Sequence, residues 1–178
     1  MYQLRKPCDR LLPDSWFSFY QKEYPQYQFK LASLDDLSAI VHLERYCFNP
    51  FIAFERRRWR YLISRSVCSV LLVYDNQTLV AYLCLFPHAG WHGVEIRSLA
   101  VHWHYRRQGL GRILMRCAET FAGQQNFRSL YLSVDCVNEP AFLLYQHYGF
   151  QIKIRVKDYY GQERDAYRMR LSVDDIDR

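Results

Sequence analysis

An arginine- and glycine-rich segment near the middle of the chain has the residue types that bind phosphate groups. Arg106–Arg112 reads RRQGLGR and lies between a strand-like run and an amphipathic helical pattern. Gly109 and Gly111 permit a positive φ angle and let a ligand approach the main chain closely. The first N–H groups of the following helix have no acceptor within that helix, and together with the helix dipole they attract anions. The sequence therefore predicts a phosphate- or pyrophosphate-binding loop.

This loop differs from two familiar phosphate-binding motifs. No Gly-Lys-Ser/Thr sequence follows it, so it is not the loop of the P-loop nucleotidases. The third residue after Gly111 is Leu114, so it is not the G-x-G-x-x-G fingerprint of dinucleotide-binding folds either. A tight turn with a solvated basic flank is the alternative interpretation for a single G-x-G, and the surrounding sequence has to decide between the two.

Histidines cluster near the loop without completing a metal site. His88, His92, His102 and His104 are close in sequence, but no set of cysteines or carboxylates with ligand spacing accompanies them. We predict no metal and interpret these residues as loop histidines beside a substrate or as surface residues. The basic run Glu55–Arg60 is not accompanied by an RNA-binding motif, so a solvated helix face is the simpler interpretation and nucleic acid is not a predicted partner.

The composition is that of one soluble, basic domain. The chain has 178 residues, and 24 Lys plus Arg against 18 Asp plus Glu give a charge of +6, which favours anionic partners. No apolar run is long enough to span a membrane, and no signal peptide is recognisable. The six cysteines form no Cys-x-x-Cys pair, so we expect free thiols and a cytoplasmic protein.

Strand-like and helical patterns alternate on both sides of the loop. The order in the second half of the chain is strand, helix, strand, helix, strand, strand, which predicts an α+β fold with a mixed sheet, parallel around the two later helices. Strands are expected at residues 29–32, 69–75, 78–86, 93–101, 129–137, 150–156 and 165–173, and helices at 37–48, 53–65, 109–122 and 139–149.

Two spaced motifs resemble those of the GNAT superfamily of acyl-CoA N-acyltransferases. Residues 106–111 match its R/Q-x-x-G-x-G/A loop, and Asn138–Phe150 (NEPAFLLYQHYGF) resembles its N-x-x-A-x-x-L-Y-x-x-x-G-F stretch. The resemblance covers roughly Leu31–Leu171. It implies αβα layers around a mostly antiparallel sheet of about six to seven strands, with a splayed central parallel pair and about four helices. We expect one such domain at 29–178, preceded by an N-terminal extension at 1–28 that packs on it.

The resemblance implies that acetyl-CoA is the cosubstrate and assigns residues to it. The main chain at 99–101 would bind the pantetheine arm as an added strand does, and the loop would hold the pyrophosphate. Asn138 would contact the cofactor near the thioester, unless it only caps a helix, and Tyr145 would face the sulfur, unless it is only a core aromatic. The implied cofactor-binding residues are Leu99, Ala100, Val101, Arg106, Arg107, Gln108, Gly109, Leu110, Gly111, Arg112, Asn138 and Tyr145.

Acetylation of an amine also needs a group that removes a proton from the ammonium. Glu95 lies six positions before Val101, where several members of the superfamily carry a catalytic glutamate. An ion pair with Arg97 on the same face of the strand is the alternative interpretation. Bacterial ribosomal-protein alanine acetyltransferases, whose last hairpin resembles DYYGQERDAYRMRL, carry their glutamate five residues before the Asn. Ser133 occupies that position here, and Asp135 is a weaker alternative base.

The resemblance to N-terminal acetyltransferases also implies a groove for the acceptor. Tyr159 and Tyr160 would line one wall, and Phe48, Phe51 and Phe54 the other. The sequence thus predicts an acetyl-CoA-dependent N-acetyltransferase that acts on a primary amine of a protein or peptide, with an N-terminal α-amine favoured and direct attack in a ternary complex. A small-amine acetyltransferase and a non-catalytic acyl-CoA-binding regulatory module are the alternatives. We expect a monomer or homodimer that does not bind membranes.

Overall fold

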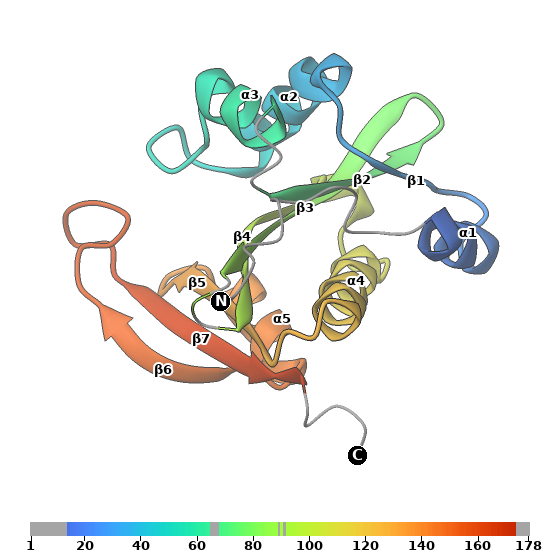
Figure 1. Cartoon of the computed structure of the whole chain (residues 1–178). Coiled ribbons are helices and arrows are strands. Elements are labelled where there is room, and N and C mark those ends of the chain that lie inside the picture. Colours follow the sequence, from blue (N-terminus) through green and yellow to red (C-terminus); the bar gives the residue numbers. More distant parts are fainter. Residues whose placement is uncertain (1–13, 65–67, 89, 91, 174–178) are drawn as a thin grey trace.

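One twisted sheet with helices on both faces makes up the molecule (Figure 1). The structure is a computed structural model that describes residues 14–64, 68–88, 90 and 92–173. Its seven strands follow the order β1-β2-β3-β4-β5-β7-β6, and all neighbouring strands are antiparallel except β4 and β5, which are parallel. The predicted α+β fold, with a mostly antiparallel sheet and one central parallel pair, is therefore confirmed.

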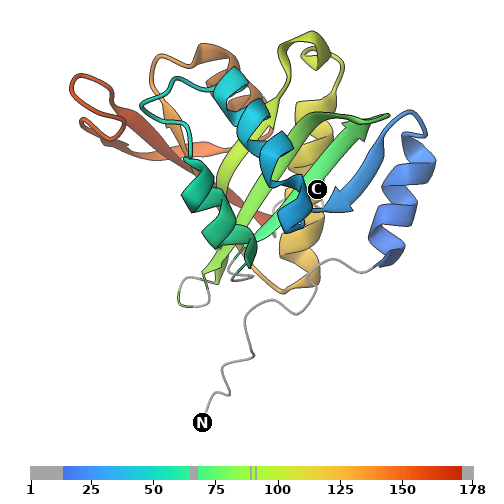
Figure 2. The same cartoon turned by 90° about the horizontal axis from the view of Figure 1, so that it is seen from above.

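The described elements follow the predicted order, and a short helix lies before β1 in the segment expected to pack on the domain. The strands are β1 (Gln28–Leu31), β2 (Ser69–Asp75), β3 (Thr78–His88), β4 (Gly93–Val101), β5 (Ser129–Asp135), β6 (Gln151–Val156) and β7 (Ala166–Ser172). The helices are α1 (Asp14–Glu23), α2 (Leu37–Cys47), α3 (Arg56–Ser64), α4 (Leu110–Gln124) and α5 (Glu139–His147). In both views α2 and α3 lie on one face of the sheet and α1 and α4 on the other (Figures 1 and 2).

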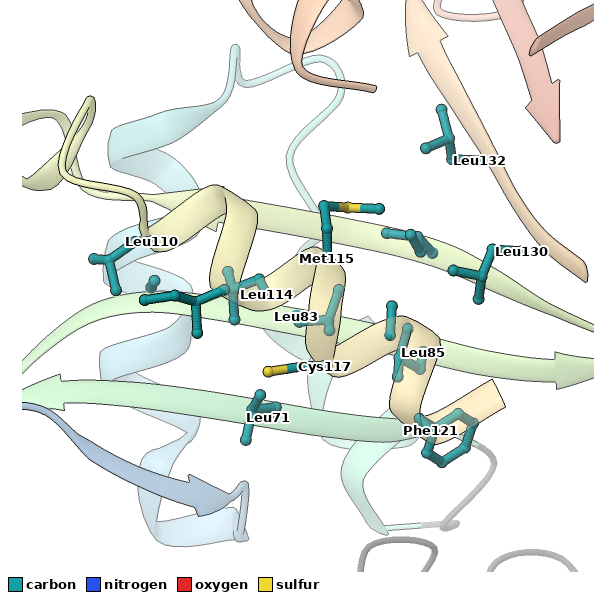
Figure 3. Packing of buried hydrophobic residues seen from close by; sticks show 14 of the residues in the cluster. Leu71, Leu83, Leu85, Leu110, Leu114, Met115, Cys117, Phe121, Leu130 and Leu132 are labelled. Carbon is teal, nitrogen blue, oxygen red and sulfur yellow. The ribbon is translucent and has the colours of Figure 1, made fainter. Parts of the chain in front are cut away.

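Helix α4 is held by an apolar stripe of period 3.6, as the sequence predicts. Its side chains Leu114, Cys117 and Phe121 are fully buried and point toward Leu71, Leu83 and Leu85 of β2 and β3 (Figure 3). Burying a side chain of this size contributes about 1.5–3 kcal/mol. This packing fixes the start of α4, and with it the glycine loop, relative to the end of β4.

The N-terminal segment contributes to the same core. Tyr20 of α1 is 3% exposed and packs in the cluster that contains α4. Residues 1–13 of the predicted extension lie outside the described residues, and the boundary at residue 28 stays a prediction. Among the described residues, no helix has the length and apolar character needed to cross a membrane.

The opposite face is covered by α2 and α3, and it buries a carboxyl group. Glu44 of α2 is 1% exposed; it accepts hydrogen bonds from the N–H of Phe54 (2.7 Å) and from the hydroxyl of Tyr82. The Tyr82 hydroxyl also lies 2.8 Å from Oγ of Ser98 on β4. Burial raises the pKa of Glu44 to about 7. This pKa has a direct consequence for stability.

Between about pH 4.5 and 7 the folded protein should hold a proton on Glu44 that the unfolded chain has already released. The free energy of unfolding should therefore fall as the pH rises through this window, by up to roughly 3 kcal/mol. Glu44→Gln removes the titration, so its urea-unfolding free energy should fall less over the same window. Equal pH dependence of the two proteins between pH 5 and 8 would contradict this prediction.

Candidate active site

The parallel strands β4 and β5 separate before either of them ends. Pairing runs from Gly93–Ser129 to Ile96–Leu132, whereas β4 continues to Val101 and β5 to Asp135. From residue 97 onward β4 therefore has no neighbouring strand on its β5 side. The split leaves room for an extended ligand between the two strands.

A bulge and the hydrogen-bond alternation of β4 determine which main-chain groups face this split. Ser98 pairs with Cys84 and Ile96 with Leu85, so Arg97 is an extra residue in β4. The N–H of His102 donates to the carbonyl of Val80. Because the ladder alternates, the main-chain groups of Leu99 and Val101 point toward the split. Those of Ala100, two residues before His102, point toward β3, so only two of the three predicted residues offer main-chain groups.

The glycine loop has the conformation that the sequence predicts at Gly109 but not at Gly111. Gly109 has a φ of 86° and immediately precedes α4, and a Cβ built there meets no atom within 4 Å. Gly111 is helical. A Cβ on it would lie 3.1 Å from Cδ2 of Leu144 on α5. The expectation of a positive φ at Gly111 is wrong: this glycine instead allows α4 and α5 to pack closely.

The loop presents its basic side chains to solvent. Arg106, Arg107 and Arg112 are exposed, and Arg107 has a φ of 63°. Nε of Arg106 donates to the carbonyl of Val101 (3.1 Å), and Nε2 of Gln108 donates to the carbonyl of His104 (2.8 Å). Together with the free N–H groups that open α4 at Leu110, the side chains form a site suited to a pyrophosphate.

Gly109→Val should raise the dissociation constant for acetyl-CoA at least about tenfold, because a β-branched residue does not tolerate a positive φ and the loop must change shape. The fold should survive, since the position is open. Gly123→Val, at an open position near the end of α4, is the control. Calorimetry and thermal unfolding measure both effects. An unchanged affinity of the Gly109 variant for acetyl-CoA would remove the loop from the site.

Helix α5 places Asn138 at its start and Tyr145 at the core. Oδ1 of Asn138 accepts a hydrogen bond from the N–H of Ala141 (3.3 Å), so Asn138 caps the helix. Tyr145 is 8% exposed and packs against Phe150, with 5.9 Å between ring centroids. Burial raises the pKa of Tyr145 to about 12, so its phenol is protonated at neutral pH.

Glu95 lies on the face of the sheet opposite α4, beside the split. Its carboxylate contacts Nε2 of His88 at 3.0 Å and Nη1 of Arg97 at 3.6 Å, and its side chain is 15% exposed. The predicted ion pair with Arg97 is thus present. Glu95 also lines a depression of about 210 Å³, which has room for a small group such as an amine. An ion pair and a role as base are compatible in this arrangement.

Asp135, the alternative base, has other partners. It is 5% exposed, forms an ion pair with Arg164, and accepts a hydrogen bond from the N–H of Val137 (3.1 Å). These two contacts already occupy the carboxylate, so it is less available to an acceptor amine than that of Glu95. Ser133 stands at the position of the glutamate in the ribosomal-protein enzymes. Its carbonyl accepts a hydrogen bond from the hydroxyl of Tyr160 (2.9 Å).

The aromatic residues predicted for the acceptor side lie on two loops. Tyr159 and Tyr160 are in the β6–β7 loop, with 4.8 Å between ring centroids in an edge-to-face contact. The α2–α3 loop holds Phe51, which is 92% exposed, and Phe48, which packs on the core under α2 and α3. Both views show the two loops side by side (Figures 1 and 2). Phe54 instead packs on Trp59 and under Arg58.

Two contacts at this site involve residues outside the sequence motifs, so the motifs could not predict them. His88 reaches Glu95 across the β3–β4 pair, and Glu44 reaches Ser98 through Tyr82. The only sequence signals were the position of His88 near the end of a strand and a charged residue on the apolar side of a helix. His102 and His104 stack with one another and, respectively, with Tyr46 and Trp103. Within the described part of the chain no group of three or more His, Cys, Asp or Glu could hold a metal ion.

A comparison with protein families identifies what these features have in common. A model described as the Acetyltransferase (GNAT) family matches residues 8–150, which include the split, the glycine loop and α5. The chain belongs to this family. The resemblance noted in the sequence is therefore confirmed, and with it the membership in a family of acyltransferases.

Individual relatives differ in how much of their length this GNAT chain spans. An uncharacterized protein of Mycobacterium leprae is 36% identical over 143 residues, which are 76% of this chain but 38% of that protein. An N-alpha-acetyltransferase of Sulfolobus acidocaldarius is 25% identical over 159 residues, 80% of this chain and 90% of that protein. The chain thus spans well under half of the first relative and nearly all of the second.

A solved structure shows the same GNAT fold. The ribosomal-protein-S18-alanine N-acetyltransferase from Escherichia coli aligns with a TM-score of 0.74 over 83% of this chain and 94% of that one, at 21% identity. This likeness establishes the arrangement of strands and helices, and leaves the acceptor to be inferred from the residues of this chain.

Proposed function

We propose that this chain transfers the acetyl group of acetyl-CoA to a primary amine of a protein or peptide, with an N-terminal α-amine as the favoured acceptor. The observation that carries the proposal is the split between β4 and β5. It brings free main-chain groups, an anion-attracting helix start and a carboxylate to one place. The alignment with an N-alpha-acetyltransferase along most of the chain supports this choice of acceptor.

The cosubstrate would lie across the split in an extended form. The main-chain groups of Leu99 and the N–H of Val101 would pair with the amides of the pantetheine arm, as a strand pairs with a sheet edge. The carbonyl of Val101 already accepts a hydrogen bond from Nε of Arg106. The pyrophosphate would bind at the start of α4, between the N–H groups after Gly109 and the exposed arginines. Asn138 uses its carbonyl oxygen as a cap, which leaves its amide N–H groups for the cofactor.

Proton removal from the acceptor falls to Glu95. The attacking nitrogen needs a free electron pair, so its ammonium form must lose a proton to a carboxylate directly or through a water molecule. His88 and Arg97 hold the Glu95 carboxylate beside the split. The neutral amine then attacks the thioester carbonyl carbon, and main-chain N–H groups at the splayed strand stabilise the oxyanion.

Collapse of the tetrahedral intermediate releases the CoA thiolate. The thiolate needs a proton donor, and the hydroxyl of Tyr145, which carries its proton at neutral pH, would donate to the sulfur. No hydrogen-bond partner for this hydroxyl is present among the described residues, which leaves it available to the sulfur. The peptide would enter between the loop with Tyr159 and Tyr160 and the loop with Phe48 and Phe51. The free thiols of the described cysteines fit a cytoplasmic site of action.

An acetylation assay over peptides and small amines tests the proposal. Release of CoA with peptides that have a free N-terminus, and not with the same peptides blocked by N-formylation, is the expected result. Activity confined to free small amines would replace the proposed acceptor by a metabolite. Binding of acetyl-CoA without transfer to any amine in the panel would instead indicate a regulatory module.

A further inference from the structure

The depression beside Glu95 has basic side chains on its far side. It is lined on β5 by Tyr131 and Ser133, on β7 by Arg168 and on β6 by Lys153 and Ile154. The intervening residues of β5 and β7 are buried against α4 and α5, so Tyr131, Ser133 and Arg168 face away from these helices. The depression is therefore open on the same face of the sheet as Glu95.

The pairing of β4, β5 and β7 determines the distance between Arg168 and the Glu95 carboxylate. Glu95 pairs with Tyr131, and Tyr131 pairs with Arg170; two residues along the same strands, Ser133 pairs with Arg168. Two strand spacings and two residues along the strand put Arg168 about 12 Å from Glu95 at the main chain. A peptide advances about 3.3–3.6 Å per residue. A side chain on the second or third residue of an acceptor whose amine meets Glu95 can therefore reach Arg168.

The charges of these residues are not neutralised within the described part of the chain. The acids nearby already have partners: Asp135 pairs with Arg164 and Asp165 with Arg155. Glu95 itself is bound by His88 and Arg97. Nζ of Lys153, in contrast, donates to the neutral side chain of Gln151 at 3.0 Å and forms no ion pair with a described residue. No ion pair or hydrogen bond of the Arg168 side chain is present among the described residues.

Arg170, the neighbour of Arg168 on β7, is already held in place. Its Nε donates to Oγ of Ser129 at 2.9 Å, and its guanidinium lies 5.9 Å from the ring centroid of Tyr131. Arg170 therefore adds positive charge to this face. Arg168 keeps its hydrogen-bond donors for a ligand, and Lys153 keeps those that Gln151 does not use. An arginine that is free to present two parallel N–H groups is the usual partner of a carboxylate.

We propose that the acceptor carries an acidic side chain within its first three residues, and that Arg168 and Lys153 bind this carboxylate while the amine meets Glu95. The inference rests on the proposed function and narrows it to peptides with an acidic second or third residue. The two basic residues contribute to specificity and take no part in proton transfer.

Peptide pairs test this directly. The probes are hexapeptides that begin with a free amine and differ only in Glu or Gln at the second residue, with a second pair that differs at the third. The wild-type protein should have a kcat/KM about 10- to 100-fold higher for the Glu peptide of at least one pair, the range of a charge-assisted hydrogen bond. In Arg168→Gln with Lys153→Gln this ratio should fall to about one through a higher KM for the Glu peptide.

The controls separate this inference from the proposed function. Lys22→Gln removes one positive charge from α1, on the opposite face of the sheet, and should keep the wild-type preference. Arg168→Glu should reverse the preference toward peptides with Lys at the same position. Equal acetylation of the Glu and Gln peptides by the wild type, or a preference that survives in the double variant, overturns the inference and leaves the function intact. Acetylation of no peptide overturns both.

Discussion

Glu95→Gln should lower the rate of acetyl transfer by about 10²- to 10⁴-fold, the range expected for loss of a general base. Glutamine keeps the shape of the side chain but cannot accept the proton of the ammonium. Steady-state release of CoA, measured for both proteins under the same conditions, gives this ratio of rates.

Glu23→Gln is the control for this change, because Glu23 lies on α1 and its contact with Arg116 (3.4 Å) is exposed. Affinity for acetyl-CoA should be unchanged in both variants, since Glu95 faces away from α4 and the glycine loop. Wild-type turnover of Glu95→Gln would mean that the contacts with His88 and Arg97 are only structural. A water chain to solvent would then be the proton acceptor to examine.

Tyr145→Phe should also lower turnover by about 10²- to 10⁴-fold, because the departing thiolate loses its proton donor. The ring and its contact with Phe150 stay, so the fold and the affinity for acetyl-CoA should change little. The loss should appear in kcat and kcat/KM alike, as expected for an interaction made in the transition state.

Tyr27→Phe provides a matched control for Tyr145, since Tyr27 is also buried (6% exposed) but precedes β1, three strands from β4. Its turnover should equal that of the wild type. Full activity of Tyr145→Phe would show that the thiolate departs without a proton from Tyr145. Tyr145 would then be only a core residue of α5.

Local patterns in the sequence were sufficient for the elements and for the loop. The apolar stripe of α4, the strand runs and the Asn138 cap are each determined by residues within about four positions of one another, and the structure contains all of them. The same holds for the conformation of Gly109. For Gly111, a positive φ was the wrong explanation of the glycine. A side chain is excluded there by Leu144 of α5, which is 33 positions away in the chain.

The sequence by itself determined that this chain is a GNAT acetyltransferase domain. Each of its two motifs is a contiguous run of residues, so both motifs can be recognised without knowing how the chain packs. Strand alternation also placed Glu95 and Arg97 on one face. Only the tertiary structure decided which groups surround the split: His88 beside Glu95, Tyr160 on Ser133, and Glu44 linked to Ser98 through Tyr82. The reason is physical. These contacts join different strands, helices and loops, and their geometry depends on strand register, on a bulge at Arg97 and on how α2 docks, none of which a local pattern of residue types specifies.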